Sequence, residues 1–338
     1  VLKPLYGDEP LLEQALESLC RQRYEEFQIV FGVQDFADPA AAVVRRLQSR
    51  FPVRDIALVI DPTQHGPNRK VGNLINMLPA ARHDVLVIAD SDLHVAPDYL
   101  DRLVAALEPP GTGLATTLYA GLPFASLLSA QLGATQITHG FLPGALLGRA
   151  MGRQDCLGAT MALRRDTLAR IGGFPALVNH LADDNVLGQL VQGLALAVRL
   201  ADTVPLTTVP EPTLAALFRH ELRWARTIRT LVPARFAASA LQYPIFWAII
   251  AVILAPLALW SWVLLAMAWI VRAASAWGIN HALAPRLPAR LPTPSVWLLP
   301  LRELISIAVM IVSYAGLRVE WRGHILRASG PAEGSKSR

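Results

Sequence analysis

Short apolar runs alternate with amphipathic segments along the first half of the chain. The runs have the length of strands, and the segments between them repeat their leucines at helical spacing. We predict strands at residues 1–2, 27–33, 56–60, 85–89 and 113–118 and after Gly158, and helices at 11–19, 39–51, 69–76, from 97, and 180–197. Regular alternation of strand and helix is typical of βαβ units, so the sequence predicts an α/β fold with a mainly parallel sheet.

One of these strands ends in an acidic pair. Five apolar residues, Val85 to Ala89, run without a break and are followed by Asp90-Ser91-Asp92. Such a run is typical of a strand buried on both faces, and ligands of open parallel sheets bind beyond the carboxyl ends of the strands. Two carboxylates there supply hard oxygen ligands for a divalent cation, which would neutralise a diphosphate. The alternative is that Asp90 and Asp92 only cap the next turn.

Further carboxylates stand at comparable positions. Asp35 follows the predicted strand 27–33, so Asp35 and Asp90 are expected at one edge of the sheet. Asp183 and Asp184 open a predicted helix, where one acidic residue is explained by the helix dipole but two are not. The chain contains neither GxxxxGK[ST] nor GxGxxG, which argues against a P-loop enzyme and a standard dinucleotide site.

A basic, aromatic motif precedes the apolar second half. At helical spacing His220, Arg223 and Trp224 share one face. An arginine beside a tryptophan suits a pyrophosphate and a stacked ring. An interfacial helix with its tryptophan at the level of lipid headgroups is the other interpretation.

The second half contains two long apolar runs. Tyr243 to Val271 carries no charged side chain, which is long enough for one tilted membrane span; alternatively, Pro256 separates two short half-inserted or hairpin helices. The second run, 295–317, is interrupted by Arg302 and Glu303. That pair either lies near a membrane interface or limits a span to the residues after it.

Composition agrees with a membrane-associated protein. Of 338 residues 53% are hydrophobic and 17% charged, and the apolar excess is concentrated from about residue 241 onward. The net charge of +5 comes mostly from arginines just before the apolar region, which indicates the cytoplasmic side of a membrane. Nucleic acid is not an expected partner, because no basic surface interleaved with aromatic residues and no zinc pattern is present. The two cysteines, Cys20 and Cys156, suit a reducing compartment.

These patterns predict three parts: a catalytic domain at 1–235, membrane or interfacial helices at 236–328 and a disordered tail at 329–338. Because Val1 lies within a predicted strand, we expect a preceding segment, such as a membrane anchor, upstream of it.

The ordered motifs resemble those of a known group of enzymes. Asp35, Asp90, Asp184 and His220-Glu-Leu-Arg223-Trp224 are similar to the D, D, D, (Q/R)xxRW signature of inverting, membrane-bound glycosyltransferases with the GT-A fold. Within that group, Lys3-Pro4-Leu5 and Val33-Gln34-Asp35 resemble the ceramide glucosyltransferase branch, and most of all its bacterial members associated with hopanoid biosynthesis. The resemblance covers about residues 1–235 and the layout of the apolar tail. It departs from the signature at His220, where the family usually has Gln or Arg.

The resemblance implies roles for individual residues. Asp35, Lys70, Lys3 and His220 would bind the UDP-sugar donor, with Asp35 on the uracil and ribose. Asp90 and Asp92 would hold Mg²⁺ or Mn²⁺ on the diphosphate. Asp184 would be the general base, and Arg223 and Trp224 would bind the leaving diphosphate and shape the acceptor entrance. His139 falls where these enzymes carry a histidine near the sugar or acceptor, and a structural histidine is an equal alternative.

The implied reaction is transfer of N-acetylglucosamine or glucose from a UDP-sugar to a hydroxyl of a membrane lipid, with a hopanoid polyol as the first choice and ceramide as the second. The implied location is the inner membrane, multi-pass, with the catalytic domain in the cytoplasm. A processive polysaccharide synthase is the alternative enzyme, although it needs more membrane helices than this chain offers. A nucleotide-sugar-binding module is the non-enzymatic alternative, and the retained Asp90, Asp92 and Asp184 argue against it.

Overall fold

The computed structural model describes residues 1–292, 295–316, 318–321 and 324–327, which form two compact units. The first unit contains residues 1–124, 140–210 and 283–291, and the second contains 125–139, 211–282 and the described residues from 292 onward. After residue 210 the chain passes from the first unit into the second. The reason is that helix α9 (Leu214–Leu231) packs against α13 (Leu299–Ser313), the last helix of the second unit. The predicted disordered tail lies outside the described residues.

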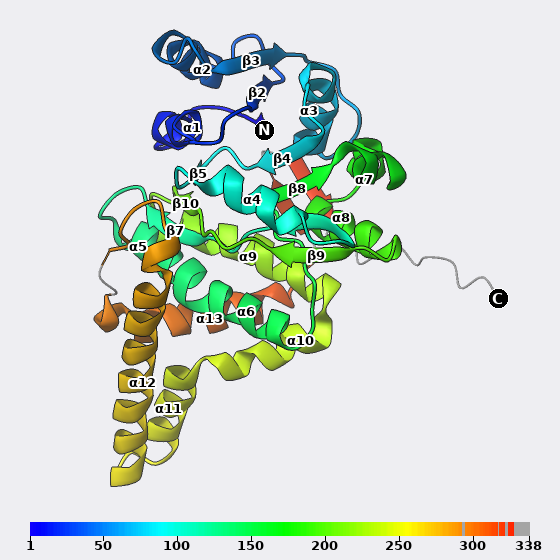
Figure 1. Ribbon diagram of the computed structural model, residues 1–338. Helices are drawn as coiled ribbons and strands as arrows, with labels where there is room; N and C mark the ends of the chain where they lie inside the picture. Colours follow the sequence, from blue (N-terminus) through cyan, green and yellow to red (C-terminus); the bar gives the residue numbers. More distant parts are fainter. Residues whose placement is uncertain (293–294, 317, 322–323, 328–338) are drawn as a thin grey trace, which may run out of the picture. The chain divides into compact units, whose positions relative to one another are not determined.

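A seven-stranded sheet with the order β3-β2-β1-β4-β8-β6-β9 forms the centre of the first unit (Figure 1). Its strands are β1 (Leu2–Pro4), β2 (Gln28–Val33), β3 (Asp55–Ile60), β4 (Val85–Ala89), β6 (Thr112–Thr116), β8 (Thr160–Arg164) and β9 (Ala197–Leu200). Only β8 runs antiparallel to its neighbours β4 and β6, so the predicted mainly parallel sheet is confirmed.

Helices cover both faces of this sheet and bury its apolar side chains. On one face lie α1 (Leu12–Cys20), α2 (Pro39–Arg50) and α4 (Tyr99–Leu107), and on the other lie α3 (Arg69–Met77), α7 (Arg165–Arg170) and α8 (Asp183–Gly193). Successive strand residues serve opposite faces: in β2, Val30 packs with the second group of helices and Phe31 with the first. The predicted apolar runs therefore form a core in two layers, as expected for strands buried on both faces.

The structure corrects the sequence prediction in two places. The helix predicted to reach residue 197 ends at Gly193, because Ala195 takes a positive φ of 58° and turns the chain into β9. No local pattern indicated the three-stranded second sheet of β5 (Leu93–His94), β10 (Leu206–Val209) and β7 (Ala120–Pro123). Helix α6 (Leu142–Ala150) also belongs to this unit.

The second unit is mainly helical. Besides α9 and α13 it contains α5 (Leu128–Gln136), α10 (Pro233–Ala238), α11 (Pro244–Leu254), α12 (Leu259–Leu283) and the strand pair β11 (Arg318–Trp321) and β12 (His324–Arg327). Among the described residues two helical segments are long and apolar enough to cross a membrane, 259–286 and 296–313, and a bent pair, 233–242 with 244–254, makes a third if it counts as one span. The apolar run 243–271 is broken at residues 255–258, so the expected break at Pro256 is confirmed. Only the first of the two helices is short, with 11 residues in α11 against 25 in α12.

Candidate active site

The edge formed by the carboxyl ends of β1, β2 and β4 carries the first predicted carboxylates. Asp35 follows β2 and Asp90 follows β4, and both strands run parallel to β1, which lies between them. The predicted shared edge is therefore confirmed. The Asp35 side chain is exposed, and its Oδ1 accepts a hydrogen bond from the Ala37 amide at 2.8 Å. Asp35 is thus accessible at this edge within a local turn.

Lys70 stands at the centre of the acidic cluster. Its Nζ lies 2.6 Å from Oδ1 of Asp90 and 3.4 Å from the carbonyl oxygen of Gly158. Burial alone would lower the pKa of Lys70, but the charges of Asp90 and Asp183 more than offset burial, and the net pKa is raised. Lys70 therefore stays charged over the physiological range. Asn68, which caps α3 by accepting from the Val71 amide, holds the start of the helix that carries this lysine.

Asp183 and Asp184 enter the same cluster from the first turn of α8. Asn68 Nδ2 donates to Oδ1 of Asp183 at 3.3 Å, and Oδ1 of Asp184 accepts from the Asn185 amide at 2.7 Å. Burial, and next the charge of Asp183, raise the pKa of Asp184 to about 6, while the Asn185 amide and the Lys70 charge oppose the rise. A carboxyl with this pKa is ionised at neutral pH and basic enough to accept a proton.

Asp92 is held differently from Asp90. Its carboxylate accepts a hydrogen bond from Thr207 Oγ1, and its backbone oxygen accepts from the Thr208 amide at 3.1 Å. Burial, and next the charge of Asp90, raise the pKa of Asp92 to about 6. Asp92 therefore ties the loop after β4 to β10, which is a structural role, and it also adds a second carboxylate beside Asp90.

Lys3 lies beneath this pair, inside the sheet. It is 1% exposed, and its Nζ donates to the carbonyl oxygen of Leu93 at 3.2 Å. Burial lowers the pKa of Lys3 to about 8, and the charges of Asp92 and Asp90 limit the fall. Lys3, which the sequence predicted to bind the donor, is therefore buried inside the protein. Its charge interacts with Asp90 and Asp92, but its side chain is not at the surface.

The acidic pair fits a divalent cation shared with a ligand. Two carboxylates at one edge repel each other. Burial is the main cause of the raised pKa of Asp92 and the charge of Asp90 is the next, and a cation between the two carboxylates would relieve their repulsion. The described residues contain no group of three or more His, Cys, Asp or Glu side chains arranged to hold a metal ion. Asp90 and Asp92 would therefore supply only part of the coordination, and phosphate oxygens of a bound donor would supply the rest.

Two further residues of this site escaped the sequence analysis. A Cβ on Gly158 would fall 2.8 Å from Oδ2 of Asp184, so glycine leaves the space that this carboxylate occupies. Burial, and next the charges of Asp184 and Asp90, raise the pKa of Tyr119, whose ring packs against that of Phe141 with centroids 5.0 Å apart. The glycine turn before β8 was visible in the sequence, but nothing near Tyr119 distinguished it from a core tyrosine.

His220, Arg223 and Trp224 belong to the second unit, on α9. The predicted common face is confirmed for two of them, since the rings of His220 and Trp224 meet edge-on with centroids 4.7 Å apart. Nδ1 of His220 contacts the carboxylate of Glu211, which stands just before the helix. This contact fixes the imidazole that occupies the first position of the motif.

His139 is also in the second unit and is buried. Its Nε2 lies 2.8 Å from Oδ1 of Asn280, and burial lowers its pKa. Asn280 Nδ2 donates to the Pro292 carbonyl, which leaves Oδ1 of Asn280 to accept the Nε2 proton. These contacts favour a structural role for His139.

The first unit has a fold of the GT-A type. A mannosyltransferase from Pyrobaculum calidifontis, solved in complex with GDP-Man and Mn²⁺, superposes with a TM-score of 0.52 at 20% identity, covering 93% of this chain and 86% of that one. The family profile of glycosyl transferase family 21 matches residues 1–332. The chain belongs to glycosyl transferase family 21.

Curated relatives are ceramide glucosyltransferases. Ceramide glucosyltransferase 1 of Caenorhabditis elegans is 23% identical over 255 residues, which is 72% of this chain and 52% of the relative. Ceramide glucosyltransferase of Komagataella phaffii is 33% identical over 111 residues, 32% of this chain and 22% of the relative. The chain thus spans about half the length, or less, of these relatives.

Proposed function

We propose that this protein transfers a sugar from a UDP-sugar to a hydroxyl group of a membrane lipid, with inversion at the anomeric carbon. The observation that carries the proposal is the cluster around Lys70, in which Asp90, Asp183 and Asp184 converge from two different elements at the carboxyl edge of the sheet. This is the edge at which open α/β sheets bind ligands. Membership of family 21 and the ceramide glucosyltransferase relatives support the same reaction class.

Donor binding falls to the residues at the sheet edge. We propose that Asp35 binds the uridine, since its carboxylate is exposed beyond β2. Asp90 and Asp92 would hold Mg²⁺ or Mn²⁺, which when bound supplies positive charge next to the diphosphate. Lys70 and Lys3 already place two cationic groups beside the same carboxylates. Of these, Lys3 lowers the pKa of Asp92 and so favours its ionised form.

The acceptor is activated by Asp184. With a pKa of about 6 its carboxylate is unprotonated at pH 7 and takes the proton from the attacking hydroxyl, a contribution of about 10²–10⁴-fold in rate. The hydroxyl oxygen forms the bond to the anomeric carbon as the bond to the diphosphate breaks. Because this is one displacement, an α-linked donor gives a β-glycoside.

The proposed roles of the α9 motif are to bind the leaving diphosphate and to line the acceptor entrance. Arg223 would pair with phosphate oxygens, since guanidinium groups bind them with two parallel hydrogen bonds. Trp224 would present its ring to the acceptor, and His220, anchored by Glu211, would fill the position that family members give to Gln or Arg.

The finer specificity is part of the same proposal. We propose UDP-N-acetylglucosamine or UDP-glucose as the donor and a hopanoid polyol as the acceptor, with ceramide as the alternative suggested by the relatives. We also propose the inner membrane as the site of action, with the first unit in the cytoplasm.

The direct test supplies radiolabelled UDP-glucose and UDP-N-acetylglucosamine in parallel to membranes containing the protein and a total lipid extract from hopanoid-producing cells, with and without EDTA. The proposal predicts label in a lipid from one donor and loss of that label on chelation. Label that enters a polymer would instead indicate a polysaccharide synthase. Donor binding without any transfer would indicate a binding module.

A further inference from the structure

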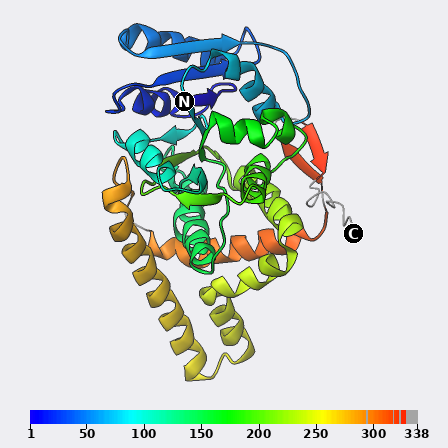
Figure 2. The same cartoon turned by 45° about the vertical axis from the view of Figure 1, so that its right-hand side comes forward.

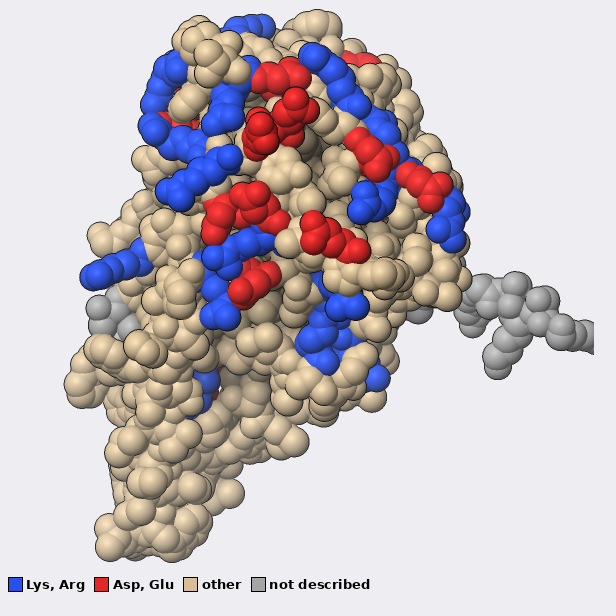
Figure 3. Space-filling view, viewed as in Figure 1, with Lys and Arg blue, Asp and Glu red and all other residues tan. Residues whose placement is uncertain are grey.

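The helices α11 and α12 form a hairpin whose outer part carries no charged side chain and is mainly apolar. Residues 243–271 carry no charge, and the side chains around the turn are exposed, among them Leu254 at 79%, Leu257 at 100% and Leu259 at 79%. Figure 3 shows no Lys, Arg, Asp or Glu on the visible surface of α11 and of the outer half of α12. An apolar surface of this extent is suited to hydrocarbon and not to water.

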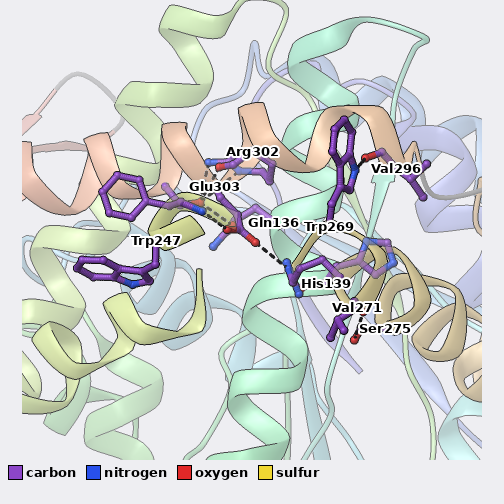
Figure 4. A network of polar contacts seen from close by, with 12 residues as sticks. Gln136, His139, Trp247, Trp269, Val271, Ser275, Val296, Arg302 and Glu303 are labelled. Carbon is purple, nitrogen blue, oxygen red and sulfur yellow. Dashed lines mark hydrogen bonds and ion pairs between the residues drawn. The ribbon is translucent and has the colours of Figure 1, made fainter. Parts of the chain in front are cut away.

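The root of the hairpin is marked by one buried carboxylate. Glu303 on α13 is 1% exposed; its Oε2 accepts from the Phe246 amide in the first turn of α11 at 3.0 Å, and its Oε1 accepts from Nε of Arg272 on α12 at 2.9 Å. Close by, the indole of Trp269 donates to the Val296 carbonyl at 2.8 Å (Figure 4). Both arms are therefore held to α13 at a defined level.

The distance from this root to the turn is too short to cross a bilayer. Helix α11 has 11 residues and is about 16 Å long. Helix α12 continues to Leu283 and is long enough to cross a membrane as a whole, but its uncharged part, from Leu259 to Val271, measures about 20 Å at 1.5 Å per residue and is followed by Arg272 at the root. A hydrocarbon core is about 30 Å thick. The segment 233–242 does not lengthen the first arm, because it meets α11 at a bend of 67°. In Figures 1 and 2, α13 runs across the root and does not extend either arm.

The turn also satisfies its own carbonyl groups. Ser261 Oγ, on a fully buried side chain, lies 2.8 Å from the carbonyl oxygens of both Ala255 and Ala258, and the Trp262 indole donates to the Pro256 carbonyl at 2.9 Å. A turn in water has no need of such partners, because water would supply the hydrogen bonds. In hydrocarbon each unpaired carbonyl is costly, so a turn located there must pair its own polar groups.

We propose that the α11–α12 hairpin enters one leaflet of a bilayer from the side of α13 and turns back within the hydrocarbon, without crossing to the other side. Its partner is therefore the acyl-chain region of a single leaflet, and Glu303 and Arg272 lie at the boundary with the headgroups. This inference concerns the mode of membrane insertion, is independent of the sugar-transfer reaction, and replaces the expectation of a multi-pass arrangement for these two helices.

The test measures the depth of the turn in vesicles of phosphatidylcholine and phosphatidylglycerol. Leu257→Cys and, as a matched control beyond the root, Ser275→Cys are labelled with an environment-sensitive fluorophore; the wild-type chain, whose Cys20 and Cys156 are buried, gives the background. Quenching lipids carry a spin label either deep in the acyl chain or near the headgroup.

The proposal predicts that the deep spin label quenches the fluorophore of Leu257→Cys more strongly, and that the shallow spin label quenches that of Ser275→Cys more strongly. Two results overturn it. One is stronger shallow quenching in Leu257→Cys, and the other is reaction of the thiol of that variant with a water-soluble reagent from either side of the vesicle.

A second pair of variants tests the free energy of membrane binding without a fluorescent label. Because Leu257 is fully exposed, Leu257→Lys leaves the fold intact, but it places a charge in hydrocarbon and should weaken flotation with vesicles on the order of 100-fold, whereas Ser275→Lys should not. Undiminished flotation of Leu257→Lys would mean that the turn reaches water and would refute the proposal.

Discussion

Nζ of Lys70 lies 2.6 Å from Oδ1 of Asp90, and this ion pair joins α3 to the end of the central strand β4. The lysine also lies in the field of Asp183 and Asp184, so it balances carboxylates that arrive from separate elements. The charge of Lys70 therefore lowers the pKa of both Asp183 and Asp184, against the effect of burial.

Removing that cation should change the pH dependence of transfer. Lys70 lowers the pKa of Asp184, so Lys70→Met should raise that pKa above its value of about 6. Because the base must be unprotonated, the acidic limb of the rate profile should move to higher pH, and activity should fall most below pH 7. Lys70→Arg retains the charge and should leave the limb near its original position. An unshifted limb in Lys70→Met would show that Asp184 does not control it.

The ionised, buried carboxylate of Asp184 should lower the free energy of unfolding at neutral pH, where it is proposed to act as the base. Its pKa is about 6 in the folded chain against an ordinary 3.8, so the folded state holds the proton more tightly than the unfolded state. Stability from this group is therefore lost as pH rises from about 4 to 6, and the full cost is present above that range. We expect Asp184→Asn to raise the unfolding free energy at pH 7 by about 1–3 kcal/mol, and by much less at pH 4.

The measurement is denaturant unfolding of the full chain at both pH values, with Asp101→Asn on the exposed face of α4 as the control. An equal change in stability at pH 7 and pH 4 would contradict the assignment of the raised pKa to Asp184.

Because Asp184 occupies the space beside Gly158, we expect replacement of Gly158 with alanine to impair activity far more than the same replacement at Gly193. Gly158→Ala would bring a methyl group to 2.8 Å from Oδ2 of Asp184, so the carboxylate or the turn must shift. We expect a loss of kcat of at least about 10-fold, with a stability cost of about 1–3 kcal/mol. Gly193→Ala, whose methyl group would meet nothing within 4 Å, is the matched control and should keep its activity. Equal activities of the two variants would argue against a catalytic position for Asp184.

The acidic pair can be tested through donor binding. Replacing Asp90 and Asp92 together with alanine should weaken Mn²⁺-dependent UDP binding on the order of 10²-fold, since both oxygen ligands of the cation are lost. Calorimetric titration of UDP with and without Mn²⁺ measures the effect, and Thr207→Val, which removes only the hydroxyl bonded to Asp92, is the control for the structural tie to β10. If UDP binding in the presence of Mn²⁺ is unchanged by the double substitution, Asp90 and Asp92 do not bind the cation and only cap the turn after β4.

The sheet could be predicted because its signals are local. An unbroken apolar run such as Val85 to Ala89 indicates a buried strand by itself, and the edge at which Asp35 and Asp90 lie follows from parallel topology. The pairing of Lys70 with Asp90 was not predictable in the same way, since it depends on how α3 packs on the sheet. Short strands such as β5, with two residues, leave no pattern to recognise.

In the second unit, too, contacts between residues far apart in the sequence could not be predicted. Arg302 and Glu303 interrupt an apolar run, and the sequence placed them near an interface or at the start of a short span. In the structure both are buried. Arg302 pairs with Glu221 at 2.7 Å, and Glu303 pairs with Arg272, partners that lie 81 and 31 residues away. Such partners cannot be recognised from one sequence, because no local spacing connects them.

In the proposed mechanism Asp184 deprotonates the lipid hydroxyl during transfer from a UDP-sugar. This role is tested by the initial rate of radiolabel transfer into lipid by wild type and Asp184→Asn in the same membranes, together with their affinities for UDP. We expect a rate lower by at least about 10²-fold in the variant, with UDP affinity nearly unchanged. A variant rate close to that of wild type would contradict it.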